Sequence, residues 1–172
     1  MRRSILLAGL ALAGCEVYSV PDTVECPGTK VGGFVLALKY SDAGSTCPNV
    51  GANPAIQVGA TLSFQPDGGA AICLDRPHAV PFLGTHTGDD VLVGNLDPAA
   101  TVPPCTCPVV VVNEIDGHVV RNADGGFADF ASRWRSTLAP PDGGATDAGQ
   151  DGGGICGCGL PCQVLYTADG GT

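Results

Sequence analysis

The stretch Val109–Arg121, VVVVNEIDGHVVR, indicates the fold class most directly. Two runs rich in β-branched residues, Val109–Ile115 and His118–Arg121, flank the pair Asp116-Gly117. An Asp-Gly pair between such runs is typical of a two-residue β-hairpin loop, because both turn residues need a positive φ. The sequence therefore predicts an antiparallel hairpin that turns at Asp116-Gly117.

Shorter runs of apolar and β-branched residues lie on both sides of this hairpin. The triplet Asp67-Gly68-Gly69 separates two of them and predicts a second turn. Glycine is abundant, with 26 residues, and favours turns over long helices. The further predicted strands are Phe34–Tyr40, Ala55–Val58, Thr61–Gln65, Ala70–Leu74, Asp90–Leu96 and Gln163–Thr167, with Gly59 breaking the second from the third. The chain thus predicts a mainly β fold, a small disulfide-stapled antiparallel β domain with long loops.

One short helix is predicted after the hairpin, near residues 127–138. Apolar side chains recur there at helical spacing, namely Phe127, Phe130, Ala131, Trp134 and Leu138. Asp129 and Arg133 stand four residues apart in the acid-first order that supports a helix. Asp124 is placed to cap its start, and Pro140-Pro141 to end it. We expect this helix to pack its aromatic face on the sheet.

The C-terminal part of the chain differs in composition from the rest. Residues 139–154 (APPDGGATDAGQDGGG) contain no large apolar side chain. Such a segment cannot offset the entropy cost of ordering its backbone, so it predicts a flexible Gly/Asp-rich linker. The β-rich domain is then expected over residues 30–138, and the Cys-rich tail 155–172 would be tied back to it by disulfides.

The N-terminus has the parts of an export signal in the right order. Arg2 and Arg3 supply positive charge, and Ile5–Gly14 is an apolar run of ten residues. A membrane-spanning helix needs roughly 20 apolar residues, so this run fits the hydrophobic region of a cleavable signal over residues 1–14. Small residues then lead to a cysteine in the motif Leu12-Ala13-Gly14-Cys15.

This motif resembles the lipobox of bacterial lipoproteins, and the resemblance covers residues 1–15. It implies cleavage before Cys15 by the lipoprotein signal peptidase, a diacylglyceryl group on the Cys15 thiol, and acylation of the new amine, for example with palmitate. Residues 15–29 would then form a lipidated tether. The composition of the body is similar to that of uncharacterised Gly/Asp-rich envelope lipoproteins.

The residue after the lipid-bearing cysteine bears on location. In the lipoproteins that this motif resembles, an aspartate there often retains the protein in the inner membrane. Glu16 occupies this position. The resemblance therefore favours the outer membrane of a Gram-negative cell envelope, facing the periplasm or the exterior.

The charge of the mature chain points away from nucleic acid. Of eight basic residues, Arg2 and Arg3 leave with the signal, so six remain against 17 acidic residues, a net charge of −11. No basic stripe is present, which predicts no nucleic-acid partner and no attraction to anionic lipids. The lipid would hold the protein on the membrane by itself, with an envelope protein as a possible partner.

Nine cysteines are present, and Cys15 is assigned to lipid. The other eight stand in an exported chain, where disulfides form and persist. We expect four disulfides, although eight cysteines allow 105 pairings and spacing does not select one. The candidates are Cys26, Cys47, Cys73, Cys105, Cys107, Cys156, Cys158 and Cys162.

Two cysteine pairs carry an alternative prediction. Cys105 with Cys107 and Cys156 with Cys158 are each spaced i, i+2, which on a strand places both thiols on one face and disfavours a bridge within the pair. The two pairs would cross-link to each other, or offer four thiolates to zinc. Structural zinc sites usually have two to four residues between paired ligands, so disulfides are the preferred interpretation.

Motifs for catalysis are missing from the sequence. It contains no G-x-S-x-G, H-E-x-x-H or Walker A motif, and the run Asn122–Asp129 lacks ligands at the first and last positions of a calcium loop. His78, His86 and Asp89, with Asp90 beside them, are weak candidates for a metal or acid–base site in the expected loop Asp75–Asp90. We therefore predict a non-enzymatic protein without a cofactor.

Three functions remain open. The first is a lipid-anchored, non-catalytic protein that binds a partner or has a structural role. The second is a small-ligand or metal-binding module around His78, His86 and Asp89. The third is a hydrolase whose catalytic residues are dispersed along the chain. A large exposed apolar patch would favour the first.

Overall fold

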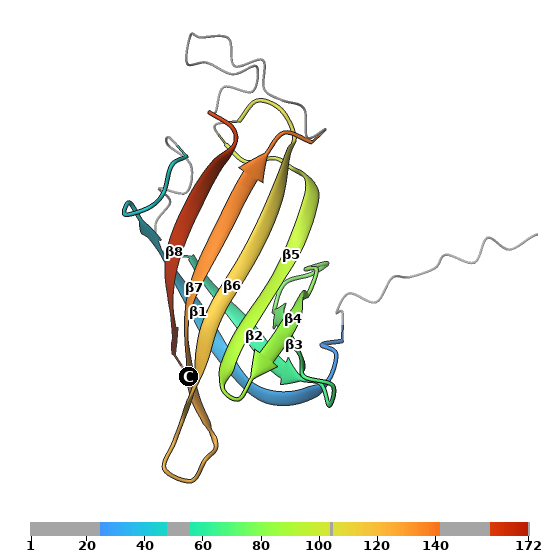
Figure 1. Cartoon of the computed structure of the whole chain (residues 1–172), viewed down its shortest axis with the longest axis vertical. Coiled ribbons are helices and arrows are strands. Elements are labelled where there is room, and N and C mark those ends of the chain that lie inside the picture. Colours follow the sequence, from blue (N-terminus) through green and yellow to red (C-terminus); the bar gives the residue numbers. More distant parts are fainter. Residues whose placement is uncertain (1–24, 48–55, 104, 142–158, 172) are drawn as a thin grey trace, which may run out of the picture.

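The protein folds into a closed antiparallel barrel of eight strands. The structure, a computed structural model, describes residues 25–47, 56–103, 105–141 and 159–171. The strands are β1 (Thr29–Ser41), β2 (Ile56–Phe64), β3 (Gly69–Leu74), β4 (Phe82–Thr87), β5 (Asp90–Ala100), β6 (Val109–Arg121), β7 (Phe127–Ala139) and β8 (Cys162–Gly171). Each pairs with the next, and β8 also pairs with β1, which closes the sheet (Figure 1). The predicted mainly β, antiparallel class is confirmed.

The helix predicted near residues 127–138 is wrong, because this segment is strand β7. Phe130 and Leu138 are buried in the barrel, whereas Arg133 and Arg135 are exposed. A spacing of four residues fits one face of a helix, but it also fits every second inward position of a strand. The small inward residues Ser132 and Ser136 separate the large ones and conceal the period of two.

No helix occurs among the described residues. Accordingly, none in this part of the chain is long and apolar enough to cross a membrane.

The turn predicted at Asp116-Gly117 is also wrong, since both residues lie within β6 and pair with β7. The chain turns instead between Asn122 and Gly126. The Asn122 side-chain oxygen accepts hydrogen bonds from the backbone N–H groups of Asp124 (3.1 Å) and Gly126 (2.7 Å). Gly125 has a φ of 79°, which a residue with a side chain rarely adopts. Asp124 therefore belongs to a hairpin turn and caps no helix.

Gly117 is explained by packing rather than by a turn. A Cβ atom at Gly117 would lie 2.8 Å from the Cβ of Ser132 and closer still to the Phe130 ring. The Phe130 side chain is fully buried and cannot move aside at little cost. A glycine in mid-strand thus makes room for an aromatic ring on the neighbouring strand.

Two other predicted boundaries change. Gly59 does not break the strand, because β2 runs through it from Ile56 to Phe64. The expected loop Asp75–Asp90 contains strand β4, so only residues 75–81 remain as a loop before it. The turn at Asp67-Gly68-Gly69 is present: Gly68 has a φ of 86°, and the Asp67 carboxylate accepts the Gly69 N–H at 3.0 Å.

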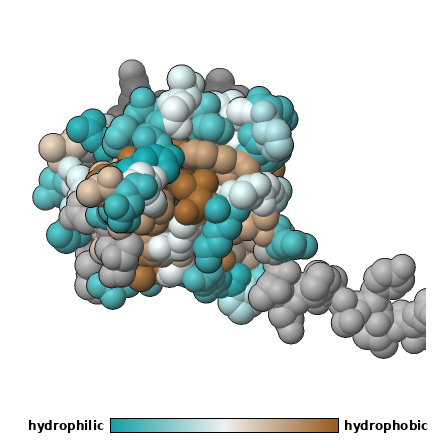
Figure 2. Space-filling view, turned by 90° about the horizontal axis from the view of Figure 1, so that it is seen from below, coloured by the Kyte–Doolittle hydropathy of each residue, from teal (hydrophilic) through white to brown (hydrophobic). Residues whose placement is uncertain are grey.

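Inward-facing side chains form two apolar clusters inside the barrel. The larger fills the half that contains the β2–β3, β4–β5 and β6–β7 turns, and its members include Phe34, Leu36, Leu62, Ile72, Phe82, Val93, Ile115 and Phe130. The smaller lies toward the other end, with Val109, Val111, Leu138, Val164 and the buried cysteines Cys47, Cys105 and Cys162. Viewed onto the end with the β6–β7 hairpin, hydrophobic surface is visible between hydrophilic side chains (Figure 2).

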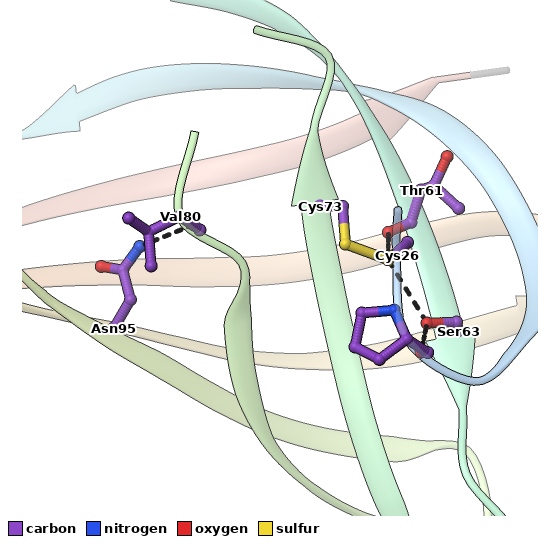
Figure 3. The surroundings of a disulfide bond; sticks show 7 residues. Cys26, Thr61, Ser63, Cys73, Val80 and Asn95 are labelled. Atoms are coloured by element: carbon purple, nitrogen blue, oxygen red, sulfur yellow. Dashed lines mark hydrogen bonds between the residues drawn. A yellow bond between two sulfur atoms is a disulfide. The ribbon is translucent and has the colours of Figure 1, made fainter. Parts of the chain in front are cut away.

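The segment that precedes β1 lies against the outside of the barrel. A disulfide joins Cys26 to Cys73 of β3 (Figure 3), and the Ser63 hydroxyl of β2 donates to the Pro27 carbonyl at 2.5 Å. This cover leaves Ser63 only 1% exposed and Ala71 fully buried, although both face outward. The end of the predicted tether is thus fixed to the barrel wall.

A second disulfide joins Cys47, just after β1, to Cys162 at the start of β8. It ties the predicted tail to the body, and β8 itself completes the barrel. Cys105 and Cys107 are disulfide-bonded as well. Cys15, Cys156 and Cys158, the signal and most of the predicted linker lie outside the described residues.

The packing at Gly117 gives a first prediction. Gly117→Ala should lower the free energy of unfolding by about 1–3 kcal/mol, because the new methyl group overlaps a buried ring. Gly33→Ala is the matched control, since a Cβ at this strand glycine meets no atom closer than 3.7 Å. Urea unfolding checks both variants. Equal stability of the two would show that Phe130 does not pack over Gly117.

The disulfide pattern gives a second prediction. Peptide mapping without reduction should recover Cys26 linked to Cys73 and Cys47 linked to Cys162, which close loops of 47 and 115 residues. Loops of this length correspond to stabilisation of about 4 and 5 kcal/mol in the chain-entropy model. Replacing Cys47 and Cys162 together by alanine should therefore lower stability strongly. A peptide linking Cys26 to Cys47 would contradict the fold.

Candidate functional site

The metal-site candidates from the sequence are not brought together. His78 lies in the loop before β4, whereas Asp89 lies in the turn after it, so β4 separates the two. His86, on β4, stacks its ring on Phe64 with the centroids 3.8 Å apart and nearly parallel. Within the described ranges, no group of three His, Cys, Asp or Glu side chains is arranged to hold a metal ion.

Asp89 instead forms a two-pronged ion pair with Arg121. The Arg121 Nε and Nη2 atoms donate to Asp89 Oδ1 at 2.8 and 2.6 Å, and Nη1 donates to the Gly125 carbonyl at 3.0 Å. The Val119 N–H donates to the Asp89 carbonyl at 2.9 Å. These bonds join the β4–β5 turn to the β6–β7 hairpin, which gives Asp89 a structural role that its sequence position did not reveal.

This pair sets the ionisation of both groups. The hydrogen bonds from Arg121 lower the pKa of Asp89 below its usual value, and those to Asp89 raise the pKa of Arg121. Beside them, His118 Nδ1 lies 2.7 Å from Asp90 Oδ1, with both side chains largely exposed. The charged groups of this cluster pair with one another and are open to solvent. The cluster therefore fits a structural link between two turns better than a reactive site.

A network of uncharged polar groups occupies the interior between the two apolar clusters. Asn113 Oδ1 accepts from the Ser136 hydroxyl at 2.6 Å and from the Trp134 indole N–H at 3.2 Å. Asn113 Nδ2 donates to Asn95 Oδ1 at 3.0 Å, and Asn95 Nδ2 donates to the carbonyl of Val80 at 3.2 Å. The network links β5, β6 and β7 to the loop before β4.

Two tyrosines continue this level around the barrel. Tyr166 of β8 stands opposite both Tyr40 of β1 and Trp134 of β7, and the two phenol rings meet edge to face with centroids 6.2 Å apart. Burial, and then the neighbouring Tyr40, raise the pKa of Tyr166, so its hydroxyl stays protonated near neutrality. We call the set of Tyr40, Asn95, Asn113, Trp134, Ser136 and Tyr166 the interior belt.

An apolar surface lies outside the same part of the barrel. Leu83 of β4, Leu92 and Leu96 of β5 and Val112 of β6 point outward and are 54%, 50%, 56% and 45% exposed. Leu83 pairs across from Gly94, and Leu96 pairs with Val112, so these side chains surround Gly94. We call this set the aliphatic face.

The interior belt and the aliphatic face could not be predicted from the sequence, because some of their residues lay in segments that were assigned the wrong structure. Leu83 lay in a segment interpreted as a loop, and Trp134 and Ser136 lay in a segment interpreted as a helix. The sequence of β5 did contain a signal for the aliphatic face. Val91 and Val93 lie on one face of this strand and Leu92 and Leu96 on the other, and a strand of a small domain that is apolar on both faces exposes one apolar face.

Comparison with protein-family models, curated proteins and solved structures finds no match to this chain. The candidate sites therefore rest on the sequence and on the geometry of the barrel.

The Asp89–Arg121 pair gives a pH prediction. The pKa of Asp89 is depressed in the fold from its usual 3.8, so the pair stabilises the fold above that pH and loses this effect as the pH falls through the lowered value. Asp89→Asn should slightly lower the urea midpoint at pH 7, and the difference from wild type should vanish under strongly acid conditions. Asp124→Asn, in the adjacent hairpin, is the control. A difference that persists unchanged in acid would exclude this ion pair.

Proposed function

We propose that this chain is a lipid-anchored protein of the cell envelope that binds a partner protein through its aliphatic face and performs no catalysis. The observation that carries the binding role is the group of four half-exposed aliphatic side chains around Gly94. Contiguous apolar surface of this kind is typical of protein-interaction sites.

The energetics suit the centre of an interface. Burying the exposed half of each aliphatic side chain contributes about 1 kcal/mol, so the four together contribute about 4 kcal/mol. Association costs at least a similar amount in lost freedom of movement, so further contacts are required. Glu114 of β6 and Arg135 of β7, paired at 3.2 Å beside the face, offer a charged rim that would favour one partner over others.

The tether restricts where the partner resides. Cys26 is held on the barrel wall, and it lies 11 positions after Cys15, which carries the predicted lipid. Fully extended, this segment reaches at most about 35–40 Å. The aliphatic face therefore stays near one membrane surface, which supports a partner carried on that same membrane.

The anchor has its own test. Wild-type protein should have the mass of residues 15–172 plus one diacylglyceryl group and one further acyl chain, because the lipobox directs cleavage and acylation at Cys15. Cys15→Ser should accumulate as unacylated precursor that retains residues 1–14. Intact-mass spectrometry distinguishes these species. A wild-type protein that is cleaved but carries no lipid would overturn the anchor.

The binding role is tested by photo-crosslinking in intact cells. A crosslinking amino acid at position 96 or 112 should capture one and the same envelope protein, and the matched position 120, an exposed valine on β6 outside the face, should not. Leu92→Gln should reduce capture at least tenfold while the melting temperature stays unchanged. Equal capture from all three positions, or none from 96 and 112, would refute the proposed interface, as would capture of a second copy of this chain.

A further inference from the structure

Beyond this proposed interface, we infer that the interior belt is a binding site for a small neutral molecule that carries a ring and hydrogen-bonding groups. The belt lies inside the barrel, and its residues pair directly across neighbouring strands: Asn95 with Asn113, Asn113 with Ser136, Trp134 with Tyr166, and Tyr166 with Tyr40. An eight-stranded barrel is wide enough to be filled by side chains or to hold one small ligand.

The belt is the level at which inward side chains of several neighbouring strands are not completely buried. Below it Val93, Ile115 and Phe130 are almost completely buried, and above it Val109 and Leu138 are too. All six belt residues point inward as well, yet each remains partly exposed. Solvent therefore reaches a continuous group of polar and aromatic side chains at this level.

The barrel wall is incomplete at the same level. Strands β3 and β4 have six residues each, so the β2–β3 ladder ends at Ala60 with Leu74 and the β4–β5 ladder at Leu83 with Gly94 (Figure 1). Beyond these pairs, no strand among the described residues pairs with β2 or β5 on this side. The loop of residues 75–81 lies there, attached by the bond from Asn95 to Val80 (Figure 3). Because a loop rather than a strand lies on this side, we expect the ligand to enter here.

The chemistry of the belt defines the ligand class. It contains no Asp, Glu, Lys or Arg, so it offers no counter-charge to an ion. Asn95 and Asn113 each keep one unused amide hydrogen, and neither tyrosine hydroxyl has a hydrogen-bond partner among the described residues. Trp134, held edge to face on Phe82 at 5.0 Å, adds an aromatic wall. These groups suit a neutral molecule with a ring and hydroxyl or carbonyl groups.

Trp134 is the single tryptophan of the chain, so its fluorescence reports on the belt alone. The probe is 4-nitrophenyl β-glucoside, a neutral molecule whose nitrophenyl ring quenches indole on contact. Its anionic counterpart is 4-nitrobenzoate. With the full-length lipidated protein, we expect saturable quenching by the glucoside and at least tenfold weaker binding of the anion. Quenching that rises without saturation, as it does for free tryptophan amide, would overturn the inference.

Variants separate this site from the outer interface. Asn95→Leu and Tyr166→Phe should each weaken probe binding at least fivefold, whereas Leu92→Gln on the aliphatic face and Glu114→Gln on the outer wall should not change it. Tyr166→Phe removes one hydroxyl and should fold even if Asn95→Leu does not. Saturable binding that is unchanged in Tyr166→Phe would place the probe elsewhere and refute the belt, without affecting the crosslinking result for the proposed partner.

Discussion

The hydrogen-bond ladders on both edges of β8 hold this fold together. β8 pairs with β1 on one side and with β7 on the other, so that a strand from the end of the chain joins the first strand to the seventh. Closure leaves the sheet without a continuous free edge, which removes a template for aggregation. The bond between Cys47 and Cys162 stands at the start of β8 and fixes its position against β1. Without this strand, Tyr40 and Trp134 would have no common neighbour and the interior belt would not form.

Closure of the barrel also determines where the tether, the aliphatic face and the interior belt lie. The sheet is least complete where its strands are shortest, and in this barrel that side is formed by β3 and β4. The segment that precedes β1, with its Cys26–Cys73 disulfide, covers the outside of β2 and β3. The outside of β4 and β5 remains apolar, and no described residues cover it. One side of the barrel thus receives the tether, and the adjacent side presents the aliphatic face. The interior belt lies inside the barrel, next to both of these sides.

The fold class and the turn at Asp67-Gly68-Gly69 could be predicted from the sequence, but strand β7, which most changes the interpretation, could not. Runs of apolar residues bounded by turn residues predicted β3, β5 and much of β1. β7 was missed because Phe130, Trp134 and Leu138 recur every four residues, a spacing that helices and strands share when small residues intervene. Asp116-Gly117 failed as a turn because Gly117 is required by a ring on another strand, a contact that no local pattern contains. The belt was equally hidden, since its residues come from five strands and meet only after closure.

The central claim is that β8 closes the barrel, and the backbone contacts of Tyr166 test it most directly. NMR on the isotope-labelled protein can measure cross-strand nuclear Overhauser effects at this residue. Closure predicts contacts from Tyr166 to Tyr40 on one side and to Trp134 on the other, in the same sample. Contacts to only one of these two residues would describe an open sheet and contradict the account.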